Sequence, residues 1–235
     1  MNLPCFYAES ISVENECIVL DEDNSRHLVQ VLRLKKGEQV QLTDGQGNLL
    51  TTSLVADQKK SAQVRVLSTE KCPPPAPRTA IGISLIKNTS RFEWFLEKAA
   101  EIGVNEIIPL ICERTEKQHF RIDRMRNILI SAMLQSRQVW LAQLHDPIRF
   151  SDVLTRFTLP QRFIAHCLDG ERHSLSKLAD AHRDNLVLIG PEGDFTQKEI
   201  EQALINRYTP VLLGKTRLRT ETAGIVAATL LKSAY

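Results

Sequence analysis

The sequence predicts a small β-barrel with one helix, followed by an α/β domain with a largely parallel sheet. Four prolines fall within residues 73–77, a run that forms neither a helix nor a central strand and indicates a short stiff linker. The chain before this run consists of short stretches with the alternation of strands. The chain after it alternates apolar runs with helical patterns. The predicted domains are therefore residues 1–72 and 73–235.

The first domain is predicted from alternating apolar and polar residues. Asp44-Gly45 indicates a tight turn between two of its strands. One helix is expected over residues 24–32, where residues 27 and 31, and residues 28 and 32, recur at helical spacing. The expected strands are residues 17–20, 39–43, 49–55 and 63–67.

The second domain is predicted from the change of rhythm after the prolines. Apolar side chains at three- and four-residue steps indicate helices over residues 92–102, 122–133 and 223–231, and Gly103 marks the end of the first. Pro109 lies inside the strand-like run 106–111, which favours an edge strand or a strand end. The other expected strands are residues 81–86, 163–167, 186–189 and 211–213.

The composition is that of an ordinary globular protein, with 43% hydrophobic residues, 25% charged residues and a net charge of +2. No apolar run is long enough to span a membrane and the amino terminus lacks a secretory signal, so we expect a cytoplasmic protein. Five cysteines without a C-x-x-C pair indicate reduced, mostly buried thiols and no metal site. Basic residues gather between residues 114 and 137, which fits either a solvated helix face or a surface that meets phosphates.

Two predicted strands of the second domain run into polar loops that contain glycine. Residues 188–195 (LIGPEGDF) precede Thr196 and Glu199, a T-x-x-E capping box that opens a helix. Residues 212–222 (LLGKTRLRTET) repeat the order of strand, glycine and helix. Ligands of open α/β sheets bind at the carboxyl ends of strands, and glycine lets backbone groups approach them closely. Together the loops predict one shared ligand site.

Several other site classes are disfavoured because their motifs are missing. The sequence contains no G-x-G-x-x-G fingerprint, no P-loop, no G-x-S-x-G elbow and no H-E-x-x-H zinc motif. His166, on the predicted strand before the two loops, is kept as a neighbour of the site. Four other histidines lie in polar surroundings and are expected at the surface: His119, His145, His173 and His182.

The two loops resemble the characteristic loops of the RsmE family, SPOUT-superfamily enzymes that methylate N3 of a uridine in 16S ribosomal RNA. The similarity extends along the whole chain. Residues 27–33 (HLVQVLR) resemble the family's H-x-x-x-V-L-R, residues 97–104 (EKAAEIGV) its QKATELGV helix, and residues 113–114 its E-R pair. The combination of GPEG with LRTET is the specific part of the match.

This resemblance implies a fold and a cofactor. A PUA-like β-barrel would precede a SPOUT methyltransferase domain with a carboxyl-terminal trefoil knot, and two chains would form a homodimer. S-adenosylmethionine would bind in the knotted loops. A side chain added at Gly190 or Gly214 would then block the cofactor and leave the fold intact. The expected cofactor-binding residues are His166, Leu188, Ile189, Gly190, Pro191, Glu192, Gly193, Leu213, Gly214, Leu218, Thr220 and Thr222.

The resemblance also implies an RNA partner, which would be 16S rRNA or the small ribosomal subunit. His27 and Arg33 of the barrel would bind RNA, together with Arg114, Gln135 and Arg137 of the second domain. Deleting the barrel would then remove RNA methylation and leave cofactor binding detectable.

The chain departs from the family pattern at three places. Asp194 follows GPEG where many members have a glycine, so this loop is expected to close differently. Cys5 stands before two aromatic residues where many members have arginine, and residues 134–137 (LQSR) replace the family's E-Q-x-x-R.

Catalysis is expected to centre on Arg219 and Glu221. Removing the uracil N3 proton places negative charge on the flanking carbonyl oxygens, which a fixed guanidinium stabilises. Arg219 is the candidate for this role, and Glu221 would orient it or take the proton. Arg219 also fits a surface charge that caps a helix.

Two alternatives to this function stay open. The chain could be a SPOUT methyltransferase for another RNA position, or an RNA-binding protein without activity. Stoichiometric binding of S-adenosylmethionine separates an enzyme from the second of these.

Overall fold

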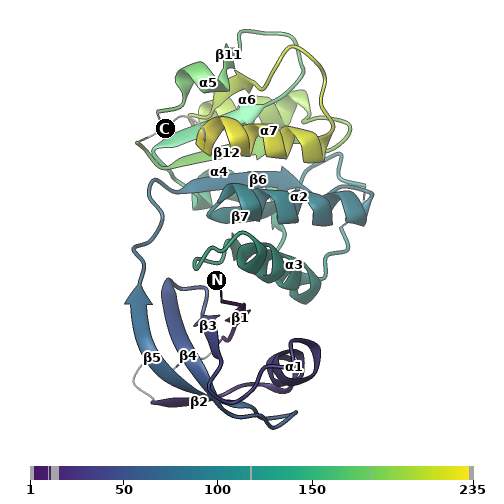
Figure 1. Cartoon of the computed structure of the whole chain (residues 1–235). Helices are drawn as coiled ribbons and strands as arrows, with labels where there is room; N and C mark the ends of the chain where they lie inside the picture. Colours follow the sequence, from purple (N-terminus) through teal and green to yellow (C-terminus); the bar gives the residue numbers. More distant parts are fainter. Residues whose placement is uncertain (1–2, 10, 12–15, 117, 181, 233–235) are drawn as a thin grey trace. The chain divides into compact units, whose positions relative to one another are not determined.

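The computed structural model describes residues 3–9, 11, 16–116, 118–180 and 182–232. The chain divides into two compact units, whose elements are labelled in Figure 1. The first unit comprises Met1–Pro74 and Met133–Leu141, and the second comprises Pro75–Ala132 and Ala142–Tyr235. The segment Met133–Leu141 lies beyond the proline run, so its place in the first unit differs from the predicted boundary.

The first unit is built on a curled five-stranded sheet in the order β1-β3-β4-β5-β2 (Figure 1). Its pairs are antiparallel except for β1 with β3. Alternate residues of the central strands, including Val40, Leu42 and Leu50, are fully buried, because successive side chains of a strand point to opposite faces. The strands are β1 (Cys5–Tyr7), β2 (Cys17–Val19), β3 (Gln39–Thr43), β4 (Asn48–Ala56) and β5 (Gln63–Lys71).

The helical part of this unit starts earlier than predicted and changes its winding. Asp21 caps α1 (Glu22–Arg26) by accepting a hydrogen bond of 2.8 Å from the Asn24 amide. The chain then continues as a single π-helical turn, η1 (His27–Val31). Leu28 is fully buried, whereas Val31 is 66% exposed.

The predicted turn at Asp44-Gly45 is present and pairs with the late segment of the unit. Gly45 has a φ of 70°, the left-handed conformation that favours glycine. Its carbonyl accepts from the Leu141 amide at 2.8 Å, and the Gly47 amide donates to the Val139 carbonyl at 2.9 Å. A Cβ at Gly47 would lie 2.5 Å from the Trp140 ring, so this close approach also requires glycine.

The second unit is built on an eight-stranded sheet in which every described pair is parallel. Its order is β11-β13-β10-β12-β6-β7-β8, with β9 also pairing with β7. All residues of β6 and β12 are buried, which explains their continuous apolar runs. The strands are β6 (Thr79–Ser84), β7 (Glu106–Ile111), β8 (Gln143–Leu144), β9 (Ile148–Arg149), β10 (Gln161–Ala165), β11 (His173–Ser174), β12 (Asn185–Ile189) and β13 (Thr209–Leu212).

Helices cover both faces of this sheet. The helices are α2 (Thr89–Ile102), α3 (Ile122–Gln135), α4 (Phe150–Arg156), α5 (Leu175–Leu178), α6 (Gln197–Ile205) and α7 (Thr220–Lys232). The last three residues of α3 belong to the first unit. α7 lies beside α2, and a Cβ at Gly224 would come within 3.0 Å of the Ile83 side chain of β6 (Figure 1). Ala80 of the same strand joins the core that contains α4 and α6.

Most long elements of the second unit match their prediction, but three expectations were wrong. Pro109 lies inside an internal strand. On the edge of β7 that faces away from β6, β8 pairs as far as Ile107 and β9 begins to pair at Leu110. Pro109 lies in the gap between these two partners, where its missing amide hydrogen is tolerated. His145 is partly buried, with its Nε2 2.6 Å from Glu106 Oε1. The prediction that most cysteines are buried was also wrong, because only Cys112 of the five free cysteines is buried.

Candidate functional site

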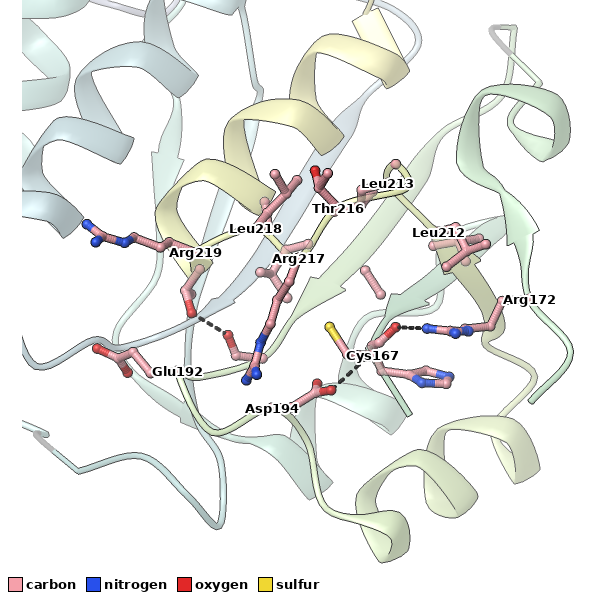
Figure 2. Close-up of a pocket in the computed structure, with 18 of the residues that line it drawn as sticks. Cys167, Arg172, Glu192, Asp194, Leu212, Leu213, Thr216, Arg217, Leu218 and Arg219 are labelled. Carbon is pink, nitrogen blue, oxygen red and sulfur yellow. Dashed lines mark hydrogen bonds between the residues drawn. The ribbon is translucent and has the colours of Figure 1, made fainter. Parts of the chain in front are cut away.

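A cavity of about 550 Å³ opens in the second unit where three parallel strands end (Figure 2). Its walls come from the segment after β10, the GPEG loop after β12 and the long loop between β13 and α7. These strands are neighbours in the sheet, so their carboxyl ends meet at one edge. The lining includes Ala165, His166, Cys167, Arg172, Ile189, Gly190, Pro191, Glu192, Asp194, Val211, Leu212, Leu213, Gly214, Lys215, Thr216, Arg217, Leu218, Arg219, Thr220 and Ala223.

The GPEG loop is a tight turn held against the core. The Asp194 amide donates to the Pro191 carbonyl at 2.9 Å. A Cβ at Gly190 would lie 3.1 Å from both the ring and the amide of Phe195, which is fully buried. A side chain at Gly190 would therefore press against Phe195, so a substitution there tests the packing of the core as well as the cofactor site.

Gly214, which follows β13 in the loop before α7, is different. A Cβ built there meets no atom within 4 Å, so the space beside this backbone is open. Because Gly214 lines the cavity, a side chain added there would occupy part of the space open to a ligand.

The two glycine loops are joined by a buried hydrogen bond. The hydroxyl of Thr220, the first residue of α7, donates to the Gly190 carbonyl at 3.0 Å. This bond holds the start of α7 against the end of β12, so Thr220 shapes the cavity by connecting its two walls.

The segment after β10 forms the third wall, and His166 follows this strand instead of lying on it. Arg172 Nη1 donates to the His166 carbonyl at 2.7 Å. His166 Nδ1 and Arg172 Nε are buried and have no hydrogen-bond partner in the described structure. Buried polar atoms are rarely left unpaired, so both are available to a polar ligand. Burial, with a smaller contribution from Arg172, lowers the pKa of His166, and Asp194 opposes this shift.

Charges of opposite sign line different walls of the cavity. Glu192 and Asp194 belong to the GPEG loop, whereas Lys215, Arg217 and Arg219 belong to the loop before α7. In Figure 2, Arg217 extends into the space between Glu192 and Asp194, and Arg219 points away from Asp194. Glu192 also accepts from the Lys87 amide at 3.0 Å, which connects the GPEG loop to the segment between β6 and α2.

The two catalytic candidates have different surroundings. Arg219 is exposed and lines the cavity. Glu221 is only 7% exposed and does not line it; its Oε1 lies 3.7 Å from Arg91 Nε of α2. The described contacts of Glu221 thus include Arg91 and no hydrogen bond or ion pair with Arg219.

Comparison with known proteins decides the family. A family model described as an RNA methyltransferase domain matches residues 73–232, and a model described as an RNA methyltransferase PUA domain matches residues 20–67. The chain belongs to the RNA methyltransferase family. The first model alone covers more than half of the chain.

Individual relatives of this RNA methyltransferase support the same assignment. A probable rRNA-methyltransferase from Porphyromonas gingivalis is 36% identical, with a TM-score of 0.93 over 99% of this chain and 98% of the other. A ribosomal RNA small subunit methyltransferase E from Neisseria gonorrhoeae, solved with bound S-adenosyl methionine, is 27% identical, with a TM-score of 0.86 over 99% and 98%. The Synechocystis protein of the same name is 29% identical over 89% of this chain and 71% of its own. The resemblance to the RsmE family is confirmed.

Most residues predicted to bind the cofactor lie together in this RNA methyltransferase, and three do not reach the cavity wall. Leu188 is fully buried in the core, Gly193 packs beside Arg114, and Thr222 lies in the first turn of α7. Those that line the cavity are His166, Ile189, Gly190, Pro191, Glu192, Leu213, Gly214, Leu218 and Thr220.

The residues predicted to bind RNA divide between the units. His27 and Arg33 are exposed in the first unit, where the His27 ring packs edge-on against Phe6 at 5.5 Å. Gln135 and Arg137 are also exposed and belong to the segment Met133–Leu141 of that unit. Arg114 belongs to the second unit, where its Nη1 donates to the Gly193 carbonyl at 2.6 Å.

Several residues of the cavity wall were not predicted from the sequence. Cys167 and Arg172 follow β10, a predicted strand whose carboxyl end was not treated as a third loop of the site. Arg217 directly precedes the LRTET motif, and only Arg219 of that motif was predicted to act in catalysis. Asp194 was noted only as a departure from the family pattern.

Among the described residues, no helix is long and apolar enough to cross a membrane. The same residues contain no cluster of three histidine, cysteine, aspartate or glutamate side chains arranged to hold a metal ion.

Proposed function

We propose that this chain transfers a methyl group from S-adenosylmethionine to N3 of a uridine in 16S ribosomal RNA. The observation that carries the proposal is the cavity at the ends of β10, β12 and β13, because both RsmE-like loops line it. The names of the relatives and the S-adenosyl methionine in the Neisseria structure support it.

The cavity suits this cofactor in size and chemistry. About 550 Å³ lies within the range of small-molecule sites, roughly 300–1,000 Å³. S-adenosylmethionine carries a sulfonium, an ammonium and a carboxylate, and the cavity offers acidic and basic side chains on different walls. Open backbone at Gly214 and the unpaired His166 Nδ1 offer further contacts for its neutral part.

The proposed cofactor contacts come mainly from the backbone. Gly190, Leu213, Gly214 and Leu218 would hold adenine and ribose, with Ile189, Pro191 and His166 beside them. Glu192 would line the side on which the methyl group leaves. Thr220 would act through its bond to the Gly190 carbonyl, which keeps the two loops at a fixed separation. Leu188, Gly193 and Thr222 would support these loops from outside the wall.

The sulfonium supplies an activated methyl group. The protein therefore has to align uracil N3 with this methyl group and remove the N3 proton. A nitrogen–carbon bond forms at uracil N3 while the carbon–sulfur bond breaks, leaving a neutral thioether, and the N3 proton leaves to a base. Arg219 would stabilise the negative charge that develops on the flanking oxygens. Glu221, held beside Arg91, is the proposed proton acceptor or orienting group.

Five finer features belong to the same proposal. We propose that 16S rRNA or the small ribosomal subunit contacts His27, Arg33, Arg114, Gln135 and Arg137. The resemblance to SPOUT enzymes also supports a trefoil knot in the carboxyl-terminal part, a homodimer and a cytoplasmic location. The proposed domains along the sequence are residues 1–72 and 73–235, with Met133–Leu141 packed in the first compact unit.

Calorimetric titration with S-adenosylmethionine tests the cofactor part of the proposal. An active enzyme should bind about one cofactor per chain. An RNA-binding protein without activity should show no heat of binding, and that result would exclude the proposed function. A methyltransferase for another RNA position would bind the cofactor equally well, so that alternative requires analysis of the product.

A further inference from the structure

Asp194 joins two walls of the cavity through its side chain. Its carboxylate accepts two backbone hydrogen bonds, from the Cys167 amide at 2.7 Å through Oδ2 and from the Phe195 amide at 2.8 Å through Oδ1. Figure 2 shows the bond to Cys167 crossing from the GPEG loop to the segment after β10. Hydrogen bonds to an ionised acceptor are roughly twice as strong as neutral ones.

The backbone at Asp194 has the conformation that glycine would adopt more easily. Its φ is 63°, and side chains other than those of asparagine and aspartate rarely occupy this region. Asp194 therefore carries a side chain at a position whose backbone conformation favours glycine. The side chain contributes what glycine lacks, a bridge between the GPEG loop and the end of β10.

We propose that Asp194 is a positioning residue that fixes His166 and Cys167 as the third wall of the cofactor cavity. This inference rests on the proposed S-adenosylmethionine site. Arg172 donates to the His166 carbonyl, so the two contacts together hold the carbonyl and the amide of the His166–Cys167 peptide. Without the carboxylate, the amide of Cys167 loses its partner and this wall becomes mobile.

Two glycine variants separate the bridge from the backbone strain. Asp194→Gly removes the carboxylate and relieves the left-handed backbone. Arg207→Gly is the matched control, since Arg207 has a φ of 64°, is exposed and does not line the cavity. We expect Asp194→Gly to weaken S-adenosylmethionine binding by about tenfold, the lower end for loss of a hydrogen bond to a charged group. Arg207→Gly should leave the dissociation constant unchanged.

Hydrogen exchange of the Cys167 amide in the free protein gives a readout independent of the cofactor. Exchange should be faster in Asp194→Gly than in the wild type and unchanged in Arg207→Gly. Asp194→Asn tolerates the same backbone and keeps one acceptor oxygen, so it should restore part of the protection and of the affinity. Equal affinity and equal Cys167 exchange in Asp194→Gly and the wild type would overturn the proposal. If the wild type bound no S-adenosylmethionine, the proposed function would fail, while the exchange rates would still decide whether Asp194 fixes this segment.

Discussion

Two glycines of the cavity differ in what surrounds them, and this difference gives a test of where the cofactor binds. Space beside Gly214 is open, whereas Gly190 touches the buried Phe195. Gly214→Val should abolish measurable S-adenosylmethionine binding in calorimetry and change the free energy of unfolding by less than about 0.5 kcal/mol. Gly190→Val should itself destabilise the fold by about 1–3 kcal/mol, as overpacking does. Normal cofactor affinity in Gly214→Val would contradict the placement of the site.

Arg219 lines the cavity, is exposed and is the proposed stabiliser of charge on uracil. Arg219→Ala should lower the single-turnover rate by roughly a hundredfold, the effect of losing one oriented donor, with a much smaller change in cofactor affinity. Arg219→Lys should recover little activity, because an ammonium cannot reproduce the planar two-pronged geometry. Arg183→Ala, an exposed arginine outside the cavity wall, is the control. A parallel loss of binding and turnover in Arg219→Ala would instead place Arg219 among the cofactor contacts.

At the scale of single residues, sequence patterns located the loops better than the side chains. Gly190 and Gly214 both follow apolar strands, so both were expected at the site. The sequence did not reveal that one faces packed core and the other open space, because this depends on Phe195 folding back under the loop. The bridge from Asp194 to Cys167 was equally hidden, since it joins residues 27 positions apart.

Among the elements, α6 offers the most direct test of local prediction. The T-x-x-E pattern forms a complete capping box in which Thr196 caps the Glu199 amide and Glu199 accepts from the Thr196 amide. Glu199 also accepts from the Glu113 amide at 2.9 Å. Thr196→Ala should reduce the free energy of unfolding by about 1 kcal/mol, measured by urea denaturation, and Thr196→Ser should retain most of it. An alanine variant as stable as the wild type would show that the cap does not stabilise the helix.

Long elements with a strong period were predictable, and short ones were not. The helix α2 ends at Gly103, which has a φ of 90°, as its sequence indicated. Strand β7 was predicted with its bounds, but its position inside the sheet depends on two separate short partners, β8 and β9, of two residues each. A strand of two residues is too short to show an alternating pattern in the sequence. Its conformation depends on hydrogen bonding to the neighbouring strand of the sheet.

At the scale of the whole molecule, the division into two units changes how the first unit should be tested. Met133–Leu141 belongs to it, and Trp140 packs against Gly47. Deleting residues 1–72 would expose this segment, so the expected separation of RNA methylation from cofactor binding is better tested by point substitutions.

His27→Ala combined with Arg33→Ala should weaken binding of 16S rRNA and raise its KM, with cofactor affinity unchanged. Each lost phosphate contact should also make the slope of log affinity against log salt concentration shallower by about one. Lys59→Ala, another exposed cation of the same unit, is the control. Unchanged RNA affinity in the double variant would show that this part of the first unit does not contact the substrate.

The most direct test of the central claim is mass spectrometry of the methylated RNA. Small ribosomal subunits, and separately free 16S rRNA, that lack the modification would be incubated with the protein and isotopically labelled S-adenosylmethionine. One part of the RNA would be digested to nucleosides to identify the product, and the other to oligonucleotides with a base-specific ribonuclease to locate it. We predict that the label appears in N3-methyluridine at a single position, and that Arg219→Ala accumulates it roughly a hundredfold more slowly. Label in another nucleoside, or no label in either RNA despite stoichiometric cofactor binding, would contradict the proposed function.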